Sequence, residues 1–337
     1  MKTVVITGIT GAVGKGILIS LLTRFTDIKI YGTARNADRV LALFEEVILN
    51  LPPIVKKAIE EGKVVLIPLE LDTSDVDSIS SACKKLSSSE DKIDTLFLNA
   101  GALIANGISY WGIVHQLLFD IRTFPVKPKY INHDGISMIN KEISKSFYTN
   151  VYGHYIMIRK LTEVLKKSQD ARIIWTGSSE GEKEFFDIED IQGMKSINPY
   201  GSNKYCLQLL SELFNQEFKA KNYPITSIVT SPGVIASNIA NTLLPPLFVM
   251  IFMTPALIIM RLLFGIPELT ISLKNASASI LYSFEIPLGE IDSKCRYDAT
   301  SDRFGKSKVV KTKFTDFTQE DLKSLDLYLK DLDKNTL

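Results

Sequence analysis

Short runs of β-branched and apolar residues alternate with helical patterns along most of this chain. Such alternation is typical of a parallel sheet that helices cover on both faces. The runs are almost continuously apolar, which agrees, because strands covered on both faces have no solvent-facing side. We expect strands at Thr3–Thr7, Lys29–Thr33, Lys63–Pro68, Thr95–Asn99, Arg172–Thr176 and Thr226–Thr230, with a seventh near Lys294–Asp298. The sequence therefore predicts an α/β fold built on a doubly wound parallel sheet.

The 337 residues contain no internal repeat and no low-complexity linker. We therefore expect a single domain over about residues 1–310, followed by a helical extension over 311–337. In the extension, Thr318-x-x-Asp321 precedes a run of spaced leucines, which predicts a capped amphipathic helix over Thr318–Leu329. This helix would pack on the body or contact a partner. Its apolar residues are Leu322, Leu325, Leu327 and Leu329.

Two connections are longer than an ordinary loop. The first runs from Ala102 to about Lys141, after the fourth expected strand, and the second from Ser237 to about Thr270, after the sixth. Loops of this length inside a compact domain are usually lids or binding surfaces. We expect the second to be a long insertion that covers the substrate.

The charge balance excludes nucleic acid as an expected partner. The chain has 39 basic and 38 acidic side chains, a net charge of +1, and no basic stripe. Its cysteines are Cys83, Cys206 and Cys295, which lie far apart in no metal-binding spacing. We expect free thiols in a reducing compartment and no metal site. Residues Lys2–Thr7 read as a strand and not as a secretory signal, so we expect the catalytic body to face the cytosol.

The segment from Thr7 to Gly14 joins the first expected strand to a helix that begins near Val13. Glycines here allow a tight turn and let backbone N–H groups approach a pyrophosphate at the helix N-terminus. Glycine after a strand is often only turn chemistry, so the prediction depends on the place of the loop in the first β-turn-α unit. The expected cofactor-binding residues are Gly8, Thr10, Gly11, Ala12, Val13 and Gly14.

The residue after the second expected strand indicates which dinucleotide is bound. Dehydrogenases that prefer NAD usually place an acid near this point to hold the ribose 2′-hydroxyl, whereas Arg35 suits a 2′-phosphate. We expect NADP(H), the alternative being that Arg35 is only a solvated residue; Lys15 reads as a surface charge. Asp72, after the third strand, could accept a hydrogen bond from the adenine amino group or cap the next helix. Asp75 looks more like a cap.

Tyr200 and Lys204 are four residues apart, so on a helix they lie on one face, one turn from each other. Asn198-Pro199 predicts the start of that helix, with asparagine as the N-cap and proline at the first position. A nearby ammonium stabilises a phenolate and lowers the tyrosine pKa from its usual value near 10. The phenol could then protonate a ketone oxygen as hydride arrives at the carbon.

Further polar and small residues lie at the boundaries of neighbouring strands and helices. Ser178 comes just after the fifth strand, where its hydroxyl could hold a substrate oxygen. Asn150 lies on the helix before that strand. Asn99-Ala100-Gly101 closes the fourth strand, where small residues would let a nicotinamide ribose approach. Any one of them could be a cap or turn residue, but their combination with Tyr200 and Lys204 indicates an active site.

With these motifs the chain resembles the short-chain dehydrogenase/reductase family over roughly residues 1–300. The matching residues are Thr7-Gly8 to Gly14, Asn99-Ala100-Gly101, Asn150, Ser178, Tyr200, Lys204 and Pro232-Gly233. The resemblance implies a Rossmann-type sheet and an Asn–Ser–Tyr–Lys tetrad. It implies that Tyr200 is the acid and base, that Ser178 orients the carbonyl, and that Lys204 binds the nicotinamide ribose and lowers the tyrosine pKa. Asn150 would anchor a water in a proton relay, and Pro232-Gly233 would lie beside the nicotinamide.

The chain departs from the family pattern at two places. Ala12 replaces the second glycine of the loop, with Gly11 one place early, and alanine is small enough to fit. Tyr200 follows Ser178 by 22 positions, a longer spacing than in many members, so Glu182–Ile197 must form an extra excursion at the rim. We choose Ser178 and not Ser179 because it aligns with the family serine after Thr-Gly.

Within the family the chain is most similar to the 3-keto-steroid (sterol) reductases and the related 17β-hydroxysteroid dehydrogenase type 7 group. The shared features are the long serine-to-tyrosine spacing with Asp190-Ile191 inside it, Gly107-Ile108, Trp111-Gly112, Pro125, Pro128 and Tyr297-Asp298-Ala299-Thr300-Ser301. This resemblance implies a lipophilic ketone as the substrate.

Residues Leu243–Gly265 are strongly apolar but contain Pro245, Pro246 and Pro255. A bilayer span needs about 20 residues of sustained helix, so the prolines favour a helical hairpin or an interfacial dip over a straight span. A buried helix of a soluble enzyme remains an alternative, as does a true transmembrane helix. In the family this region covers the substrate pocket.

The sequence thus predicts NADPH-dependent reduction of the 3-keto group of a sterol intermediate. Alternatives are another lipophilic carbonyl reductase, acting on a 17-ketosteroid or retinal, and a nucleotide-binding scaffold for partner enzymes in a membrane complex. We expect membrane contact through 243–265 and other sterol-pathway enzymes as partners. The expected location is the cytosolic face of the endoplasmic reticulum, with the lipid droplet or the cytoplasm as alternatives.

Overall fold

The computed structural model describes the chain except residues 135–136, 140–142, 236–246, 248, 315–316 and 337. Its main sheet has eight strands in the order β10-β9-β8-β7-β4-β1-β2-β3, and all pairs are parallel except β9 with β10. The strands are β1 (Lys2–Ile6), β2 (Ile28–Ala34), β3 (Val64–Glu70), β4 (Thr95–Leu98), β7 (Ala171–Thr176), β8 (Ile225–Ser231), β9 (Cys295–Ser301) and β10 (Ser307–Lys313). The predicted α/β fold and its seven strands are confirmed.

Strand β10 is the part of the sheet that the sequence did not predict. It pairs antiparallel with β9 at the sheet edge, and its lysines Lys308, Lys311 and Lys313 are exposed. Charged residues, lysine above all, are common on edge strands because they oppose pairing with another chain. The strand crosses residue 310, so the sheet continues past the domain boundary expected there.

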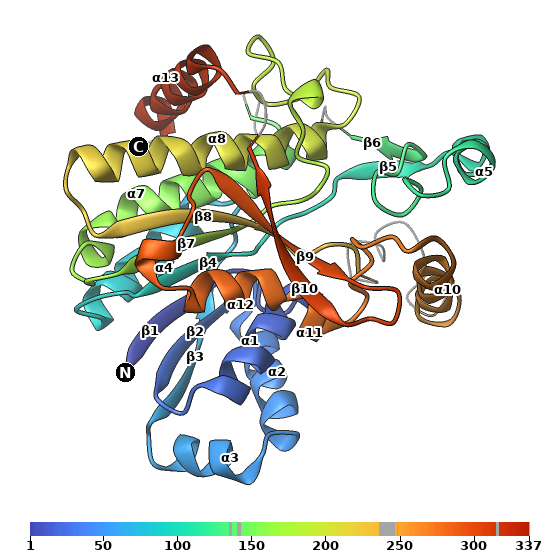
Figure 1. Cartoon of the computed structure of the whole chain (residues 1–337). Coiled ribbons are helices and arrows are strands. Elements are labelled where there is room, and N and C mark those ends of the chain that lie inside the picture. The colour runs from blue at the N-terminus through green and yellow to red at the C-terminus, as the bar shows by residue number, and fades with distance from the viewer. Residues whose placement is uncertain (135–136, 140–142, 236–246, 248, 315–316, 337) are drawn as a thin grey trace.

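Helices cover both faces of the sheet (Figure 1). One layer holds α1 (Ala12–Arg24), α2 (Ala37–Leu49), α3 (Pro53–Glu60), α11 (Leu273–Ala276) and α12 (Ala278–Glu285). The other holds α4 (Val76–Ser89), α7 (Gly153–Leu165) and α8 (Pro199–Ala220). Each layer buries its own apolar cluster against the sheet, the first around Ile17, Val40 and Phe44, the second around Ile79, Leu161 and Phe214.

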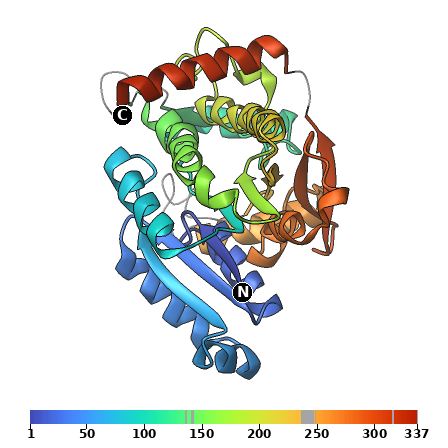
Figure 2. The same cartoon turned by 90° about the vertical axis from the view of Figure 1, so that its left-hand side faces the viewer.

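The C-terminal extension forms α13 (Gln319–Thr336), which lies on the outer side of the α7–α8 layer (Figure 2). The predicted capping box is confirmed, because Thr318 Oγ1 accepts from the Asp321 N–H at 3.1 Å and Asp321 Oδ2 accepts from the Thr318 N–H at 2.8 Å. Of the leucines in the predicted pattern, Leu322, Leu325 and Leu329 are buried and Leu327 is exposed.

The first long connection is an excursion at the edge where the parallel strands end. It contains a small hairpin, β5 (Ala105–Ile108) with β6 (Ile131–His133), and between them α5 (Tyr110–Phe119). The chain then returns through α6 (Lys145–Phe147) and a π-helix (Tyr148–Tyr152) into α7. Figure 1 shows β5, β6 and α5 reaching away from the main sheet.

The second excursion follows β8 and closes on itself at its base. The Val234 N–H donates to the Glu268 carbonyl at 2.7 Å, and the Ile271 N–H donates to the Val234 carbonyl at 3.0 Å. Above this base lie a π-helix (Val249–Met253) and α10 (Thr254–Phe264), which ends at Gly265 in the left-handed conformation, φ 63°. Residues 243–246 and 248 of the apolar segment lie outside the described residues. Among the helices that the structure describes, none is long and apolar enough to cross a bilayer.

Gly153, the first residue of α7, has the tightest surroundings of the glycines. A Cβ placed there would overlap the carbonyl oxygen of Thr73, in the loop after β3. The missing side chain therefore lets α7 approach that loop.

We expect Gly153→Ala to lower the free energy of unfolding by roughly 2–3 kcal/mol, because the backbone carbonyl it meets cannot rotate away like a side chain. Gly289→Ala is the matched control, since no atom lies within 4 Å of the added Cβ. Urea denaturation of both variants measures the difference. Equal stability of the two variants would contradict this account of the α7 contact.

Candidate active site

The carboxyl end of β1 is tied to that of β4 by a set of hydrogen bonds. Thr7 Oγ1 accepts from the N–H groups of Asn99 and Ala100 at 2.8 and 2.9 Å. The Asn99 side-chain amide donates to the carbonyls of Thr7 and Gly8 at 3.0 and 3.1 Å. Gly8 has φ +63°, and a Cβ there would lie 2.9 Å from Ala100 Cα. The structure thus brings the predicted loop and the predicted Asn99-Ala100-Gly101 together.

The loop after β1 forms a narrow cradle at the start of α1. A Cβ on Gly14 would lie 2.5 Å from the Gly8 carbonyl oxygen, so only glycine fits there. Gly11 is the N-cap of α1 and has no side chain to cap it, which leaves N–H groups of the first turn open to a ligand. Thr10, Ala12 and Val13 are partly exposed at this turn. Because α1 begins at Ala12, the alanine occupies an ordinary helical position and the loop keeps its close approach to Gly8.

The loops after β2 and β3 place the other residues expected at the cofactor. Arg35 directly follows β2 and is exposed. Lys15 forms an ion pair with Glu46 at 2.6 Å, as a surface charge would. Of the two readings of Asp72, the N-cap was wrong: Asp75 caps α4, accepting from the Asp77 N–H at 2.9 Å. Asp72 Oδ1 instead accepts from Ser74, through both its N–H and its hydroxyl.

Helix α8 carries the central pair, Tyr200 and Lys204. It starts as predicted, with Asn198 accepting from the Gly201 N–H at 2.8 Å and Pro199 in the first turn. The Lys204 ammonium lies 5.5 Å from the centroid of the Tyr200 ring, one helical turn away. It is buried and donates to the Thr176 carbonyl at 2.7 Å, at the end of β7. The pair therefore lies against the edge of the sheet where β7 ends.

Burial governs the pKa values of this pair. It lowers the pKa of Lys204 to about 8, against the attraction of Glu180. The pKa of Tyr200 is raised by desolvation and by the negative charge of Glu180, against a hydrogen bond with Ser178. The expected lowering of the tyrosine pKa is therefore not seen, because desolvation and Glu180 outweigh it. A phenol in this setting keeps its proton near neutral pH, as a proton donor must.

Ser178 and Asn150 flank the pair from two sides. Ser178, after β7, lies close enough to Tyr200 to lower the pKa of its phenol, and the Ser178 hydroxyl accepts from the Glu180 N–H at 3.1 Å. Asn150 lies in the π-helix before α7; its amide donates to the Ala102 and Ser146 carbonyls at 2.9 Å, and its oxygen accepts from the Ala102 N–H at 3.1 Å. The Asn150 side chain thus positions the chain after β4, and its part in a proton relay stays a prediction.

Glu180 is a residue at the centre that sequence reasoning missed. Its carboxylate accepts from the Asn198 side-chain amide at 3.1 Å, so it holds the residue that caps α8. Burial raises the pKa of Glu180 to about 7; Glu182 raises it further, and Lys127 and Lys204 oppose the rise. Nothing local in Gly-Ser-Ser-Glu separates this glutamate from a turn residue. Its role depends on Asn198, 18 positions later.

Two more residues support the site from outside the motifs. Arg296 on β9 pairs with Asp298 through two nitrogens, at 2.6 and 3.1 Å, and donates to the Ser178 carbonyl at 2.8 Å. His154 is buried with Nε2 3.3 Å from Thr7 Oγ1. Burial and the nearby Lys204 lower its pKa to about 4, so it is a neutral support. Neither position could be assigned without knowing which strands are neighbours.

Pro232 and Gly233 follow β8 at the same edge of the sheet. Gly233 has φ +69°, and a Cβ there would lie 2.5 Å from the Glu268 carbonyl oxygen. Gly233 and Ser179 line one cavity of about 920 Å³, which continues between β9–β10 and the segment around Val126. Of the predicted site residues only Gly233 is among the residues that line this cavity, and Ser179, the neighbour of Ser178, lines it from the end of β7.

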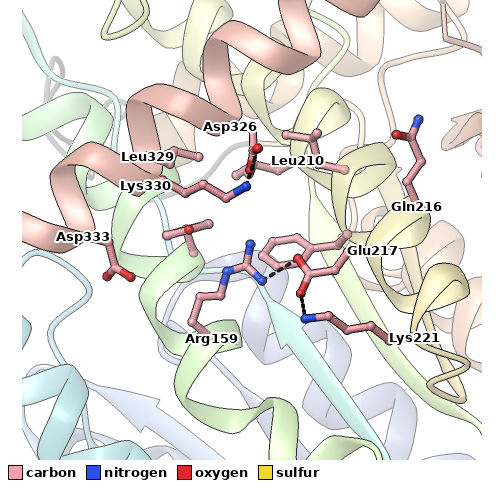
Figure 3. A pocket seen from close by; sticks show the side chains of 12 residues that line it. Arg159, Leu210, Gln216, Glu217, Lys221, Asp326, Leu329, Lys330 and Asp333 are labelled. Atoms are coloured by element: carbon pink, nitrogen blue, oxygen red, sulfur yellow. Dashed lines mark hydrogen bonds and ion pairs between the residues drawn. The ribbon is translucent and has the colours of Figure 1, made fainter.

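A second cavity, of about 580 Å³, lies between α7, α8 and α13 and contains none of the predicted site residues (Figure 3). Its centre is Arg159, which pairs with Glu217 at 2.5 Å and stacks over the rings of Tyr155 and Phe214. These contacts join helices and offer no reactive group. In the described part of the chain, no three His, Cys, Asp or Glu side chains could together hold a metal ion, and all three cysteines are buried free thiols.

Comparison with known proteins agrees with this geometry. Residues 130–246 match the family model described as short chain dehydrogenase. Over 318 residues the chain is 26% identical to the human 3-keto-steroid reductase/17-beta-hydroxysteroid dehydrogenase 7, covering 93% of this chain and 88% of the relative. It is 28% identical to a 3-keto-steroid reductase from Schizosaccharomyces pombe, covering 77% and 74%.

Solved structures show the same fold at low identity. A short-chain dehydrogenase/reductase from Caenorhabditis elegans, of unknown function and solved with its cofactor, superposes with a TM-score of 0.53 at 18% identity, covering 77% of this chain and 80% of that one. A family member from Saccharomyces cerevisiae gives 0.52 at 16%, covering 86% and 93%. Over residues 130–246 the chain thus matches the short-chain dehydrogenase family, whose oxidoreductases use NAD(P)(H), and over most of its length it is distantly similar to 3-keto-steroid reductases.

Proposed function

We propose that this protein reduces a ketone on a lipophilic substrate with NADPH, and that the ketone is the 3-keto group of a sterol intermediate. The observation that carries the reaction is that Ser178 and Lys204 both lie close to Tyr200 at the end of β7. The names of the relatives that align with most of the chain support the substrate class.

The residues present fit a dinucleotide. The glycine cradle would receive the pyrophosphate, Arg35 the 2′-phosphate and Asp72 the adenine. A Cβ on Gly101 would lie 2.8 Å from Asn150 Oδ1 and 3.6 Å from Lys204 Nζ, so glycine keeps this approach open for the nicotinamide ribose. The proposed binding residues are Gly8, Thr10, Gly11, Ala12, Val13, Gly14, Arg35, Asp72, Asn99, Ala100, Gly101, Tyr200, Lys204, Pro232 and Gly233. When bound, the cofactor supplies the hydride.

The proton for the reduction comes from a side chain of the protein. The hydroxyls of Ser178 and Tyr200, which lie near each other, would both donate to the ketone oxygen and fix its position. The Tyr200 phenol, kept protonated by its buried setting, gives its proton to the alkoxide that forms. Lys204, held by the Thr176 carbonyl, places a positive charge near the resulting phenolate. Asn150 would complete the tetrad.

We also propose contact with the cytosolic face of the endoplasmic reticulum membrane through residues 243–265. In the described part of this segment Leu247, Ile251, Ile259, Leu262 and Leu263 are exposed, an arrangement that water does not favour. A lipid-borne ketone would then reach the cavity without crossing bulk water. Other sterol-pathway enzymes at the same membrane are the proposed partners.

Tyr200→Phe should lower ketone reduction by roughly 10²- to 10⁴-fold, because the ring stays and only the proton donor is removed. NADPH binding, followed by the fluorescence of the reduced cofactor, should persist. The substrates to compare are a 3-keto sterol, oestrone and retinal, and the first should give the highest kcat/KM. Tyr282→Phe, on α12 where the ring packs against Tyr297, is the matched control. Full turnover by Tyr200→Phe would refute the catalytic assignment and leave a scaffold role.

Arg35→Asp should lower kcat/KM with NADPH by roughly 10-fold or more while NADH is used as well or better, because the acid repels a 2′-phosphate and can accept from a 2′-hydroxyl. Lys84→Asp makes the same charge change on the exposed face of α4 and should leave the preference as it is. An unchanged preference in Arg35→Asp would remove the argument for NADP(H).

Glu180→Gln should move the rising limb of the pH profile of alcohol oxidation to lower pH. Oxidation needs the phenolate, and the negative charge of Glu180 raises the Tyr200 pKa. Glutamine keeps an acceptor for the Asn198 amide and removes only the charge. Glu180→Ala removes both and should also lower kcat for reduction. An unmoved limb in Glu180→Gln would show that the charge does not act on Tyr200.

The effect of Glu180→Gln can also be measured by thermal stability, without any turnover. In the folded protein the Glu180 pKa is raised from 4.5 to about 7, so the carboxyl lowers stability as pH rises through this window. Below about pH 4.5 it is protonated whether folded or unfolded, and the penalty vanishes. The Tm of Glu180→Gln relative to the parent should therefore increase between about pH 5 and pH 8.

A further inference from the structure

Helix α5 buries a polar side chain, Gln116, and exposes most of its apolar side chains together with His115. Its one buried residue is Gln116. The exposed residues include Trp111 at 76%, Leu118 at 71% and Phe119 at 76%, together with Tyr110, Val114 and Leu117. Water-facing helices normally show the reverse pattern. An apolar face of this kind marks a contact with something other than water.

This inverted helix is nevertheless firmly held. The Gln116 amide donates to Thr123 Oγ1 at 3.0 Å and to the Lys127 carbonyl at 2.8 Å, and its oxygen accepts from the Lys129 N–H at 2.9 Å. Ser109 caps the helix by accepting from the Gly112 N–H at 3.1 Å. Since the buried glutamine has partners for both its groups, the orientation of α5 is specified and the apolar side chains are held outward.

The apolar faces of α5 and α10 belong to one side of the molecule. Val126, in the loop after α5, packs in a small cluster with Leu257 of α10 and with Ile266 and Leu269 after it. Figure 1 shows both helices projecting from the same side, away from the helix layers. Both helices therefore lie on one side of the molecule, and their exposed apolar residues are together called the α5–α10 surface.

Charge indicates what this surface meets. Neither α5 nor the segment Val249–Phe264 contains an acidic residue. Cations outnumber acids at its border: Arg122 and Lys129 follow α5, where Lys129 pairs with Asp120 at 3.4 Å, and Arg303, Lys306 and Lys308 lie around the β9–β10 turn with Asp302. Arg303 lies against the end of α10, since a Cβ on Gly265 would come within 2.9 Å of its Nε. Phe304, in the same turn, is 87% exposed.

Aromatic and aliphatic side chains without acids, bordered by cations, match the headgroup region of an anionic bilayer. Residues that follow the two helices in the chain line the 920 Å³ cavity. Val126 and Lys127 line it from the α5 side, Pro267 and Glu268 from the α10 side, and Lys306 and Lys308 from the cationic border.

We propose that α5 is a second lipid-binding element, which docks with α10 on an anionic bilayer surface. This inference rests on the proposed function only for the identity of the cargo, a ketone drawn from the lipid. The contact of α5 with lipid follows from its own inverted face. It adds to residues 243–265 an element from the other long connection, on the opposite side of the cavity.

The test is flotation of the purified full chain with vesicles of phosphatidylcholine alone or with about 30% phosphatidylserine, an anionic content that gives a clear surface potential. The parent should bind the anionic vesicles more tightly, and added salt should weaken binding. Trp111→Asp with Leu118→Asp should weaken binding about 10-fold or more, because both side chains are exposed on α5. Leu49→Asp with Ile54→Asp is the matched control, at 75% and 70% exposure on the α2–α3 side.

Undiminished vesicle binding by Trp111→Asp with Leu118→Asp would overturn the proposal. A second outcome would also overturn it: the parent binds neither kind of vesicle, and size-exclusion chromatography with light scattering shows that the parent is a dimer and the variant a monomer. In that case α5 would bind a second copy of the chain. Reduction of a water-soluble ketone, measured in parallel, should be equal in parent and variant. Vesicle binding without any ketone reduction would refute the proposed function and leave the lipid contact intact.

Discussion

The structure depends on one buried cation. Lys204 is out of water, and its ammonium is tolerated because the Thr176 carbonyl accepts from it at 2.7 Å and Glu180 lies near. This bond joins the first turns of α8 to the end of β7. Because Tyr200 is one turn before Lys204 and Ser178 is two residues after Thr176, the same bond brings phenol and serine hydroxyl together. The arrangement of the candidate site follows from satisfying this one charge.

Glu180 links the parts that this bond brings together. Its N–H holds the Ser178 hydroxyl, and its carboxylate holds Asn198, which starts the helix of Tyr200. A negative charge here opposes a phenolate and favours the ammonium of Lys204. The chain thus combines a firmly protonated phenol with a lysine whose pKa is lowered to about 8. This balance suits proton donation, the direction that ketone reduction requires.

The sequence predicts the features that are determined by local residue patterns and by the order of elements along the chain. Strands β1 to β9 of the main sheet, the Asn198 cap and the Thr318–Asp321 box are set by residues a few positions apart. Strand β10 was missed because five of its seven residues are polar and its place depends on β9. Glu180 and Arg296 were missed because each acts on a residue far along the chain. The role of Asp72 could not be decided from the sequence, because either Asp72 or Asp75 could cap α4.

Both long connections were expected to be lids or binding surfaces. That α5 buries its glutamine and exposes its apolar residues could not be predicted from the sequence. In α5 an apolar run with one glutamine would ordinarily bury the apolar side, and only the partners of Gln116 show that the polar side is buried. Parallel strands all end at one edge of the sheet, so insertions after β4 and β8 must border the groups assembled there. The edge of the sheet where the candidate catalytic residues lie therefore also determines from which surface a substrate would arrive. In this protein both insertions at that edge, α5 and α10, expose apolar residues.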